Sequence, residues 1–238
     1  MTRRDVLGLF AGGASVALAG CGGTPNSASY RFRMTVEVDT PQGLKTGSSA
    51  YEVTSIKGVR VGDRGGGGTF LRGEAVVVDL PEGPVFALLN DGNPAQTLAG
   101  MATLAFAASE GQRVKDLDQF IATVAALSAR WTTARTDLPR RRDIGVAMRS
   151  DGMDDGNWPL FVRFGDIADP KTVERVEPEA IGVRRIQLET TRDAVTTGIE
   201  KWLGWLPSLK GGYLHGGFTS RGAPLGLDGT AFSTEIGQ

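Results

Sequence analysis

The sequence predicts an α+β fold in a single domain, with an antiparallel meander sheet of about six strands covered by two main helices. Two observations carry this prediction. Between residues 30 and 89, stretches of alternating apolar and polar residues are separated by turn residues, as in strands that follow one another along the chain. After residue 94, the apolar residues recur every three or four positions, which is typical of helices that cover a sheet.

The first predicted strand pair occupies residues 30–59. Tyr30–Asp39 alternates almost perfectly, Thr40–Gly43 offers the proline and glycine of a turn, and Leu44–Val59 returns as the expected partner strand. The next stretch, Gly58–Gly68, contains six glycines. It lacks the Gly-Lys-Ser/Thr ending of a phosphate-binding loop, so a hairpin connection is the favoured interpretation.

Further alternating stretches complete the predicted sheet. Thr69–Leu80 alternates as a third strand, and the continuously apolar Val85–Leu89 predicts a central strand after the turn at Pro81–Pro84. Four strands joined in series indicate an antiparallel meander. Trp158–Phe164 and Arg184–Thr191 bring the expected number of strands to about six, with a polar connection between them.

Two helices are expected between these groups of strands. Ala95–Ser109 is rich in alanine and leucine and follows Asn93 as the expected cap and Pro94 in the first turn. Arg113–Trp131 is amphipathic, and its apolar stripe is expected to face the core. The stripe consists of Leu117, Phe120, Ile121, Val124 and Leu127.

The N-terminus has the layout of an export signal. Arg3 and Arg4 precede the apolar run Val6–Ala19, which is shorter than the about 20 residues that a transmembrane helix needs. The run ends in Leu18-Ala19-Gly20-Cys21, which resembles the bacterial lipobox. The resemblance implies that residues 1–20 are a signal peptide, that Cys21 is lipidated, and that residues 21–29 tether a domain spanning 30–238. The alternatives are a plain secretory signal and a buried helix with a core cysteine.

The same resemblance implies a location in the bacterial cell envelope. The lipid on Cys21 would anchor the protein to a membrane, with the domain facing the periplasm. Gly22 follows the cysteine where aspartate usually means inner-membrane retention, so the outer membrane is favoured. Thr2–Leu7 also resembles a twin-arginine signal, although Val6 stands where an aromatic residue is usual, and both export routes stay open.

Composition limits the classes of partner and chemistry. The formal net charge is −1 for the whole chain and about −2 without residues 1–20, so nucleic acid is not an expected partner. Cys21 is the only cysteine, so lipidation would leave neither a thiol nucleophile nor a disulfide. The C-terminal tail from about residue 207 is rich in glycine and is expected to be loose.

Four stretches resemble a family of uncharacterised proteobacterial proteins. These stretches are Tyr30–Val38, Thr46–Ser49, Phe164–Val173 and Val195–Lys201. The resemblance covers most of the chain after the tether and implies a compact folded unit. No activity is established for that family, and a shared fold alone would not imply one, so the resemblance transfers no chemistry.

Two groups of residues are candidates for binding. Trp202 and Trp205 form an aromatic patch that either packs onto the core or provides a binding edge near a membrane. Arg140, Arg141 and Arg142 form a basic run. This run either is a solvated loop or meets the phosphates of an anionic lipid. An envelope protein is the other expected partner.

Candidates for catalysis are sparse. His215 is the only histidine, and the Gly-x-Ser-x-Gly elbow of many hydrolases is absent. One histidine is too few for a zinc site, and the acidic loop at 151–157 lacks calcium-loop spacing, so neither a metal nor a cofactor is expected. The sequence therefore predicts a non-enzymatic interaction module, with a hydrolase of an envelope substrate that uses Asp/Glu or His215 as the alternative. The carboxylates considered are Asp151, Asp154, Asp155, Asp166 and Asp169.

Overall fold

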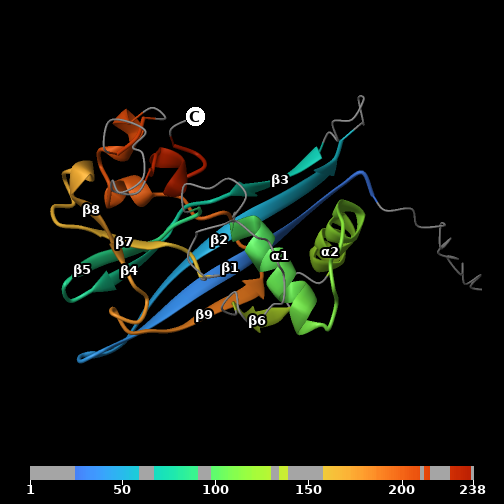
Figure 1. The fold of residues 1–238 in the computed structure, drawn as a ribbon, viewed down its shortest axis with the longest axis horizontal. Coiled ribbons are helices and arrows are strands. Elements are labelled where there is room, and N and C mark those ends of the chain that lie inside the picture. The colour runs from blue at the N-terminus through green and yellow to red at the C-terminus, as the bar shows by residue number, and fades with distance from the viewer. Residues whose placement is uncertain are drawn as a thin grey trace, which may run out of the picture.

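The computed structural model describes residues 25–58, 67–90, 98–129, 134–138, 158–209, 212–214 and 226–236. Within them the chain forms nine strands and two α-helices, and the predicted α+β class is confirmed (Figure 1). The strands form two antiparallel sheets rather than the single meander that was predicted. The strands are β1 (Ser27–Thr40), β2 (Gly43–Lys57), β3 (Gly67–Arg72), β4 (Val76–Leu80), β5 (Gly83–Ala87), β6 (Arg135–Asp137), β7 (Phe161–Phe164), β8 (Val173–Val176) and β9 (Val183–Thr190).

The larger sheet has the strand order β3-β2-β1-β9-β6 and is built on the long hairpin of β1 and β2. The predicted hairpin is confirmed, with Thr40 paired to Gly43 at a turn where Gly43 takes a φ of 109°. Alternation along β1 places Phe32, Met34 and Val36 fully inside the core. The intervening polar residues lie on the opposite face of the sheet.

The prediction of one continuous strand over 69–80 is wrong, because the chain changes sheets at Gly73. β3 ends at Arg72 in the larger sheet, and β4 begins at Val76 in the smaller one. Gly73 adopts a φ of 145°, and a Cβ there would lie 2.5 Å from Cδ1 of Tyr51. A side chain at this position would meet Tyr51, so the junction requires glycine. The change in backbone direction at Gly73 ends the pairing of β3 with β2.

The smaller sheet has the order β4-β5-β7-β8 and lies across the inner face of the larger one. Its contact with β2 is close, since a Cβ on Gly47 would lie 2.1 Å from the carbonyl oxygen of Val77. Two short strands, β6 and β8, were not predicted. Each has three or four residues, and in β8 only the two end residues are buried, so neither shows a period of two.

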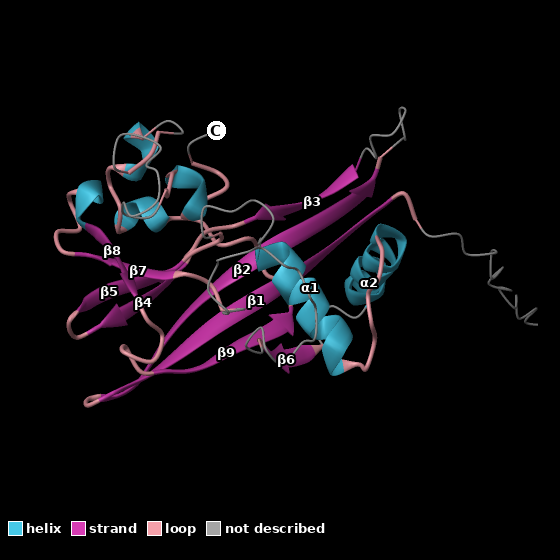
Figure 2. Ribbon diagram, in the orientation of Figure 1, coloured by secondary structure: helices cyan, strands magenta, loops and turns pink. Residues whose placement is uncertain are grey.

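The two helices α1 (Leu98–Ser109) and α2 (Leu117–Ala129) cover the inner face of the larger sheet beside the smaller one (Figure 2). The predicted stripe of α2 holds for its middle, where Ile121 and Val124 are fully buried. Leu117 was expected in the core but is 42% exposed, because it is the first helical residue and lies at the edge of the sheet beside Gly67. Neither of these described helices has the length and apolar character needed to cross a membrane.

The outer side of the smaller sheet carries a second core. Phe86, Leu88 and Val162 point into it, away from the first core that the two sheets and the helices share. The chain segment 226–236 covers this side, with Leu227 and Phe232 fully buried. The described part of the region after residue 207 is therefore packed rather than loose.

Candidate functional site

The tryptophan pair lies beside the second core, and its two members have different surroundings. Trp205, just before the 3-10 helix η4 (Leu206–Ser208), packs its ring against Phe164 and Phe232 at centroid distances of 5.6 and 6.1 Å. Its indole N–H donates to the carbonyl oxygen of Ile167 over 2.9 Å. Trp205 is half-buried and serves packing, whereas Trp202 is 39% exposed and offers the larger surface.

The two described aspartates from the list of carboxylates cap a turn. Oδ1 of Asp166 accepts from the backbone N–H of Ala168, and Oδ1 of Asp169 accepts from that of Lys171, each over 2.9 Å. Asp169 is the N-cap of the 3-10 helix η2 (Pro170–Thr172). This geometry is the ordinary structural use of aspartate before proline, and it engages both side chains.

The remaining sequence candidates lie outside the described residues. They are Cys21, the arginines at 140–142, the aspartates at 151, 154 and 155, and His215. Within the described ranges, no three His, Cys, Asp or Glu side chains gather closely enough to hold a metal ion.

Sequence reasoning missed a buried carboxyl between the two sheets. Glu74 lies in the short link between β3 and β4 and is only 2% exposed. Its Oε2 accepts from the backbone N–H of Ile199 over 2.8 Å, and its Oε1 accepts from the Ser233 hydroxyl over 3.2 Å. Both partners belong to the C-terminal part of the chain, so Glu74 joins that part to the sheets.

The backbone around Glu74 makes the same connection. The N–H of Gly73 donates to Oγ1 of Thr234 over 2.9 Å, and the N–H of Ala75 donates to the carbonyl oxygen of Phe232 over 2.8 Å. The segment 226–236 thus satisfies the polar groups that are left unpaired where the chain changes sheets.

Burial raises the pKa of the Glu74 carboxyl, and the carboxylates of Glu200 and Glu235 act in the same direction. The hydrogen bonds from Ile199 and Ser233 act against this shift. Burial likewise raises the pKa of Tyr51, and the charge of Glu74 adds to that effect. The Ser49 hydroxyl favours the ionised form of Tyr51. The Tyr51 hydroxyl nevertheless has no partner in hydrogen-bonding geometry among the described residues.

Glu74 and Tyr51 are enclosed, which limits what they can do chemically. A substrate would reach Glu74 only if the segment 226–236 moved away, because that segment supplies the Ser233 contact, and Tyr51 is buried in the first core, where it stacks on Phe32. Glu74 therefore has a structural role, because its hydrogen bonds hold the C-terminal part of the chain against the sheets. Its raised pKa follows from desolvation of an enclosed carboxyl.

Replacing Glu74 by glutamine should change how stability depends on pH. A carboxyl whose folded pKa is raised loses its proton first in the unfolded chain, so unfolding becomes easier as pH rises between the ordinary and the raised value. We expect the unfolding free energy of the wild type, relative to Glu74→Gln, to fall with pH across that window and then to level off. Denaturant titrations between about pH 4 and about pH 8 measure this difference.

Glu37→Gln is the matched control for this experiment. A hydrogen bond from Arg185 lowers the pKa of Glu37, so the contribution of this carboxylate is lost only as pH falls below the ordinary carboxyl value, and the wild-type minus Glu37→Gln difference should stay flat at higher pH. A wild-type minus Glu74→Gln difference that is flat over the whole pH range would contradict the enclosed-carboxyl interpretation.

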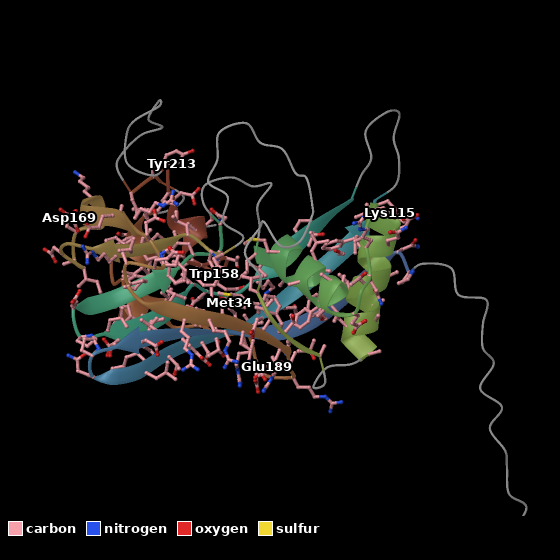
Figure 3. All side chains as sticks on the ribbon, turned by 60° about the horizontal axis from the view of Figure 1, so that its bottom comes forward. Met34, Lys115, Trp158, Asp169, Glu189 and Tyr213 are labelled. Carbon is pink, nitrogen blue, oxygen red and sulfur yellow. The ribbon has the colours of Figure 1, made fainter. Side chains whose placement is uncertain are left out.

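The outer face of the larger sheet carries a network of ion pairs. It lies on the side away from the helices, where Figure 3 shows Glu189 pointing outward and Met34 inside. Its arginines and carboxylates alternate and bind one another, so the face presents paired charges rather than a basic patch for an anion. The pairs are Arg31–Glu52, Arg72–Glu52, Arg72–Glu235, Arg33–Glu189, Arg33–Asp193, Arg135–Glu189 and Arg185–Glu37.

Comparisons of the chain with protein-family models, with curated proteins and with solved structures find no match. The resemblance of the four stretches between residues 30 and 201 thus stays a prediction.

Proposed function

We propose that the protein is a cell-envelope lipoprotein, anchored through Cys21, whose folded domain is a binding module rather than an enzyme. The observation that carries the proposal is the position of Leu18–Cys21. This lipobox-like ending closes a charged and apolar leader, and Cys21 stands only six positions before Ser27, the first residue of β1. The domain would face the periplasm, with the outer membrane favoured over the inner.

The physical basis of the anchor is the acyl chains on the cysteine. Each buried methylene contributes about 0.8 kcal/mol, and one chain alone gives only marginal membrane binding. A lipobox cysteine carries more than one chain, which makes anchoring stable. The domain itself then needs no apolar helix to stay at the membrane.

Two observations favour a binding module over a hydrolase. Asp166 and Asp169 are engaged in capping a turn, and Glu74 is enclosed beneath the C-terminal segment. The hydrolase alternative would depend on His215 or on the aspartates at 151–155, which lie outside the described residues. An envelope protein or an anionic lipid is the proposed partner.

Replacing Cys21 by serine should abolish the anchor. We expect wild-type protein extracted from membranes to begin at Cys21 and to carry the added mass of its acyl chains, whereas Cys21→Ser carries none. Intact-mass spectrometry and detergent phase partition measure both properties. Thr24→Ser, three residues further on, is the control and should behave as the wild type. Equal release of the wild type and Cys21→Ser into the soluble fraction would reject the proposal.

Crosslinking in native envelopes, followed by pull-down, tests the second half of the proposal. A binding module should give the same crosslinked partner in repeated preparations, and that partner should be retained when His215 is replaced by alanine. Hydrolysis of an envelope polymer by the wild type, lost in His215→Ala, would instead support the hydrolase.

A further inference from the structure

Three of the large apolar side chains that the structure exposes gather at one end of the domain. Ile56 at the end of β2 is 42% exposed, Phe70 of β3 is 57% exposed, and Leu117 at the start of α2 is 42% exposed. We name these three residues the end patch. Isolated apolar residues on a surface are ordinary, but a group of them at one place indicates contact with something apolar.

The register of β2 and β3 brings Ile56 and Phe70 together, and Leu117 lies close to the same edge of the sheet. Ile56 pairs with Gly68, and Phe70 pairs with Thr54, so Ile56 and Phe70 are diagonal neighbours on one face of the sheet. The Phe70 ring folds over Gly68, since a Cβ there would lie 3.4 Å from its Cζ. Leu117 lies on the other side of the same edge, with Cδ2 3.5 Å from a Cβ built on Gly67.

The end patch lies where the chain enters the domain from its N-terminus. Ser27, the first residue of β1, pairs with Ile56, and the backbone N–H of Lys57 donates to the carbonyl oxygen of Asn26 over 2.7 Å. Figure 1 shows the starts of β1 and β3 and the helix α2 at this end, with the tip of the β1–β2 hairpin at the opposite end. The last described residue before β1 is thus fixed beside the patch.

Covalent geometry limits how far this end can be from a lipidated Cys21. Five residue steps separate Asn26 from Cys21, and each spans at most about 3.5 Å, so the distance is at most about 18 Å. The hairpin tip lies a further 14-residue strand away, which is about 45 Å at about 3.3 Å per residue. An anchor at Cys21 therefore holds the end patch, and not the hairpin tip, close to the membrane.

We infer that the end patch contacts the lipid bilayer, so that the tip of the β1–β2 hairpin points away from the membrane. The inference rests on the proposed anchoring through Cys21. The bilayer is the occupant because the short connection places it there, and because Ile56, Phe70 and Leu117 would transfer apolar surface from water to its interface. Exposed charges of both signs flank the patch, with Lys115 beside Asp116 and Asp118, so the contact is apolar and does not require anionic lipid.

The test uses the mature lipidated protein in phosphatidylcholine vesicles. Because Cys21 is the only cysteine and its thiol would be bonded to lipid, Phe70→Cys supplies a single free thiol for an environment-sensitive nitrobenzoxadiazole probe. We expect blue-shifted emission and strong quenching by a lipid that carries a nitroxide near its headgroup. Ile56→Cys, on the same face, should give the same result.

Leu44→Cys is the matched control. Leu44 belongs to the same sheet and is 50% exposed, but it is ten positions along β2 from the partner of Phe70, a distance of about 33 Å. Quenching at position 70 should exceed that at position 44 several-fold.

The possible failures are distinguishable. Loss of the protein from the vesicles, with no acyl mass on Cys21, would refute the anchor and with it the inference. If acylated protein stays on the vesicles but quenching is equal at positions 70 and 44, whether weak or strong, the end patch does not contact the bilayer. The anchoring through Cys21 would then still be supported.

Discussion

Replacing Phe32 by alanine should lower the free energy of unfolding by about 3–5 kcal/mol. Phe32 is fully buried in the middle of β1, where its ring stacks on Tyr51 at a centroid distance of 5.0 Å and meets Phe106 of α1 edge-on at 6.5 Å. Truncation would remove these contacts and leave a cavity between the larger sheet and the helix. The structure could close this cavity only by moving both elements.

Urea unfolding followed by circular dichroism measures this effect, with all proteins in the same detergent. For a domain of this size the loss corresponds to a fall in melting temperature of about 6–20 °C. Phe70→Ala is the control, because it makes the same chemical change on the exposed face of β3 and should cost less than about 0.5 kcal/mol. Similar losses for the two variants would contradict the assignment of Phe32 to the core.

The second large effect is expected for Gly47→Ala. One added methyl group would lie 2.1 Å from the carbonyl oxygen of Val77 and 2.8 Å from its carbonyl carbon. Both are backbone atoms of the smaller sheet, so relief requires the two sheets to separate rather than one side chain to turn. We expect a loss of at least about 3 kcal/mol, the upper end of the usual range for overpacking.

The same unfolding measurements test this prediction against Gly204→Ala. The nearest atom to a Cβ on Gly204, outside its chain neighbours, is the carbonyl oxygen of Glu200 at 3.9 Å, which is ordinary contact. That variant should stay close to the wild type. If Gly47→Ala were equally well tolerated, the two sheets would not cross at the distance described.

The sequence predicts the strands and helices that bury one face along their whole length, because their apolar residues then recur at a regular spacing. β1 and β2 alternate because their inner residues meet the helices, and the middle of α2 repeats every three or four residues for the same reason. The change of sheet at Gly73 was missed because alternation continues on both sides of it. A lone glycine inside a strand pattern was the only local signal.

The structural role of Glu74 was missed for a different reason. The alternation that points Val76 and Val78 inward also points Glu74 inward, and a charged residue on an apolar face is a detectable signal. Its partners Ile199 and Ser233, however, are 125 and 159 positions away, and no local pattern reveals them. The sequence does not show which of Trp202 and Trp205 packs and which is exposed. The difference comes from the contacts of Trp205 with Phe164, Phe232 and Ile167, which are distant in sequence or unpatterned.

The second core also dictates an order of folding. Its members run from Ala75 to Phe232, so the outer side of the smaller sheet stays uncovered until nearly the whole chain has been synthesised. Contacts of such long sequence separation form slowly, and apolar strands left open in the meantime favour aggregation. A chain threaded unfolded through a membrane would complete this core only after its last residues had crossed. The C-terminal segment is thus the last part of the chain to join the second core, and a truncation before Leu227 should leave a chain that misfolds.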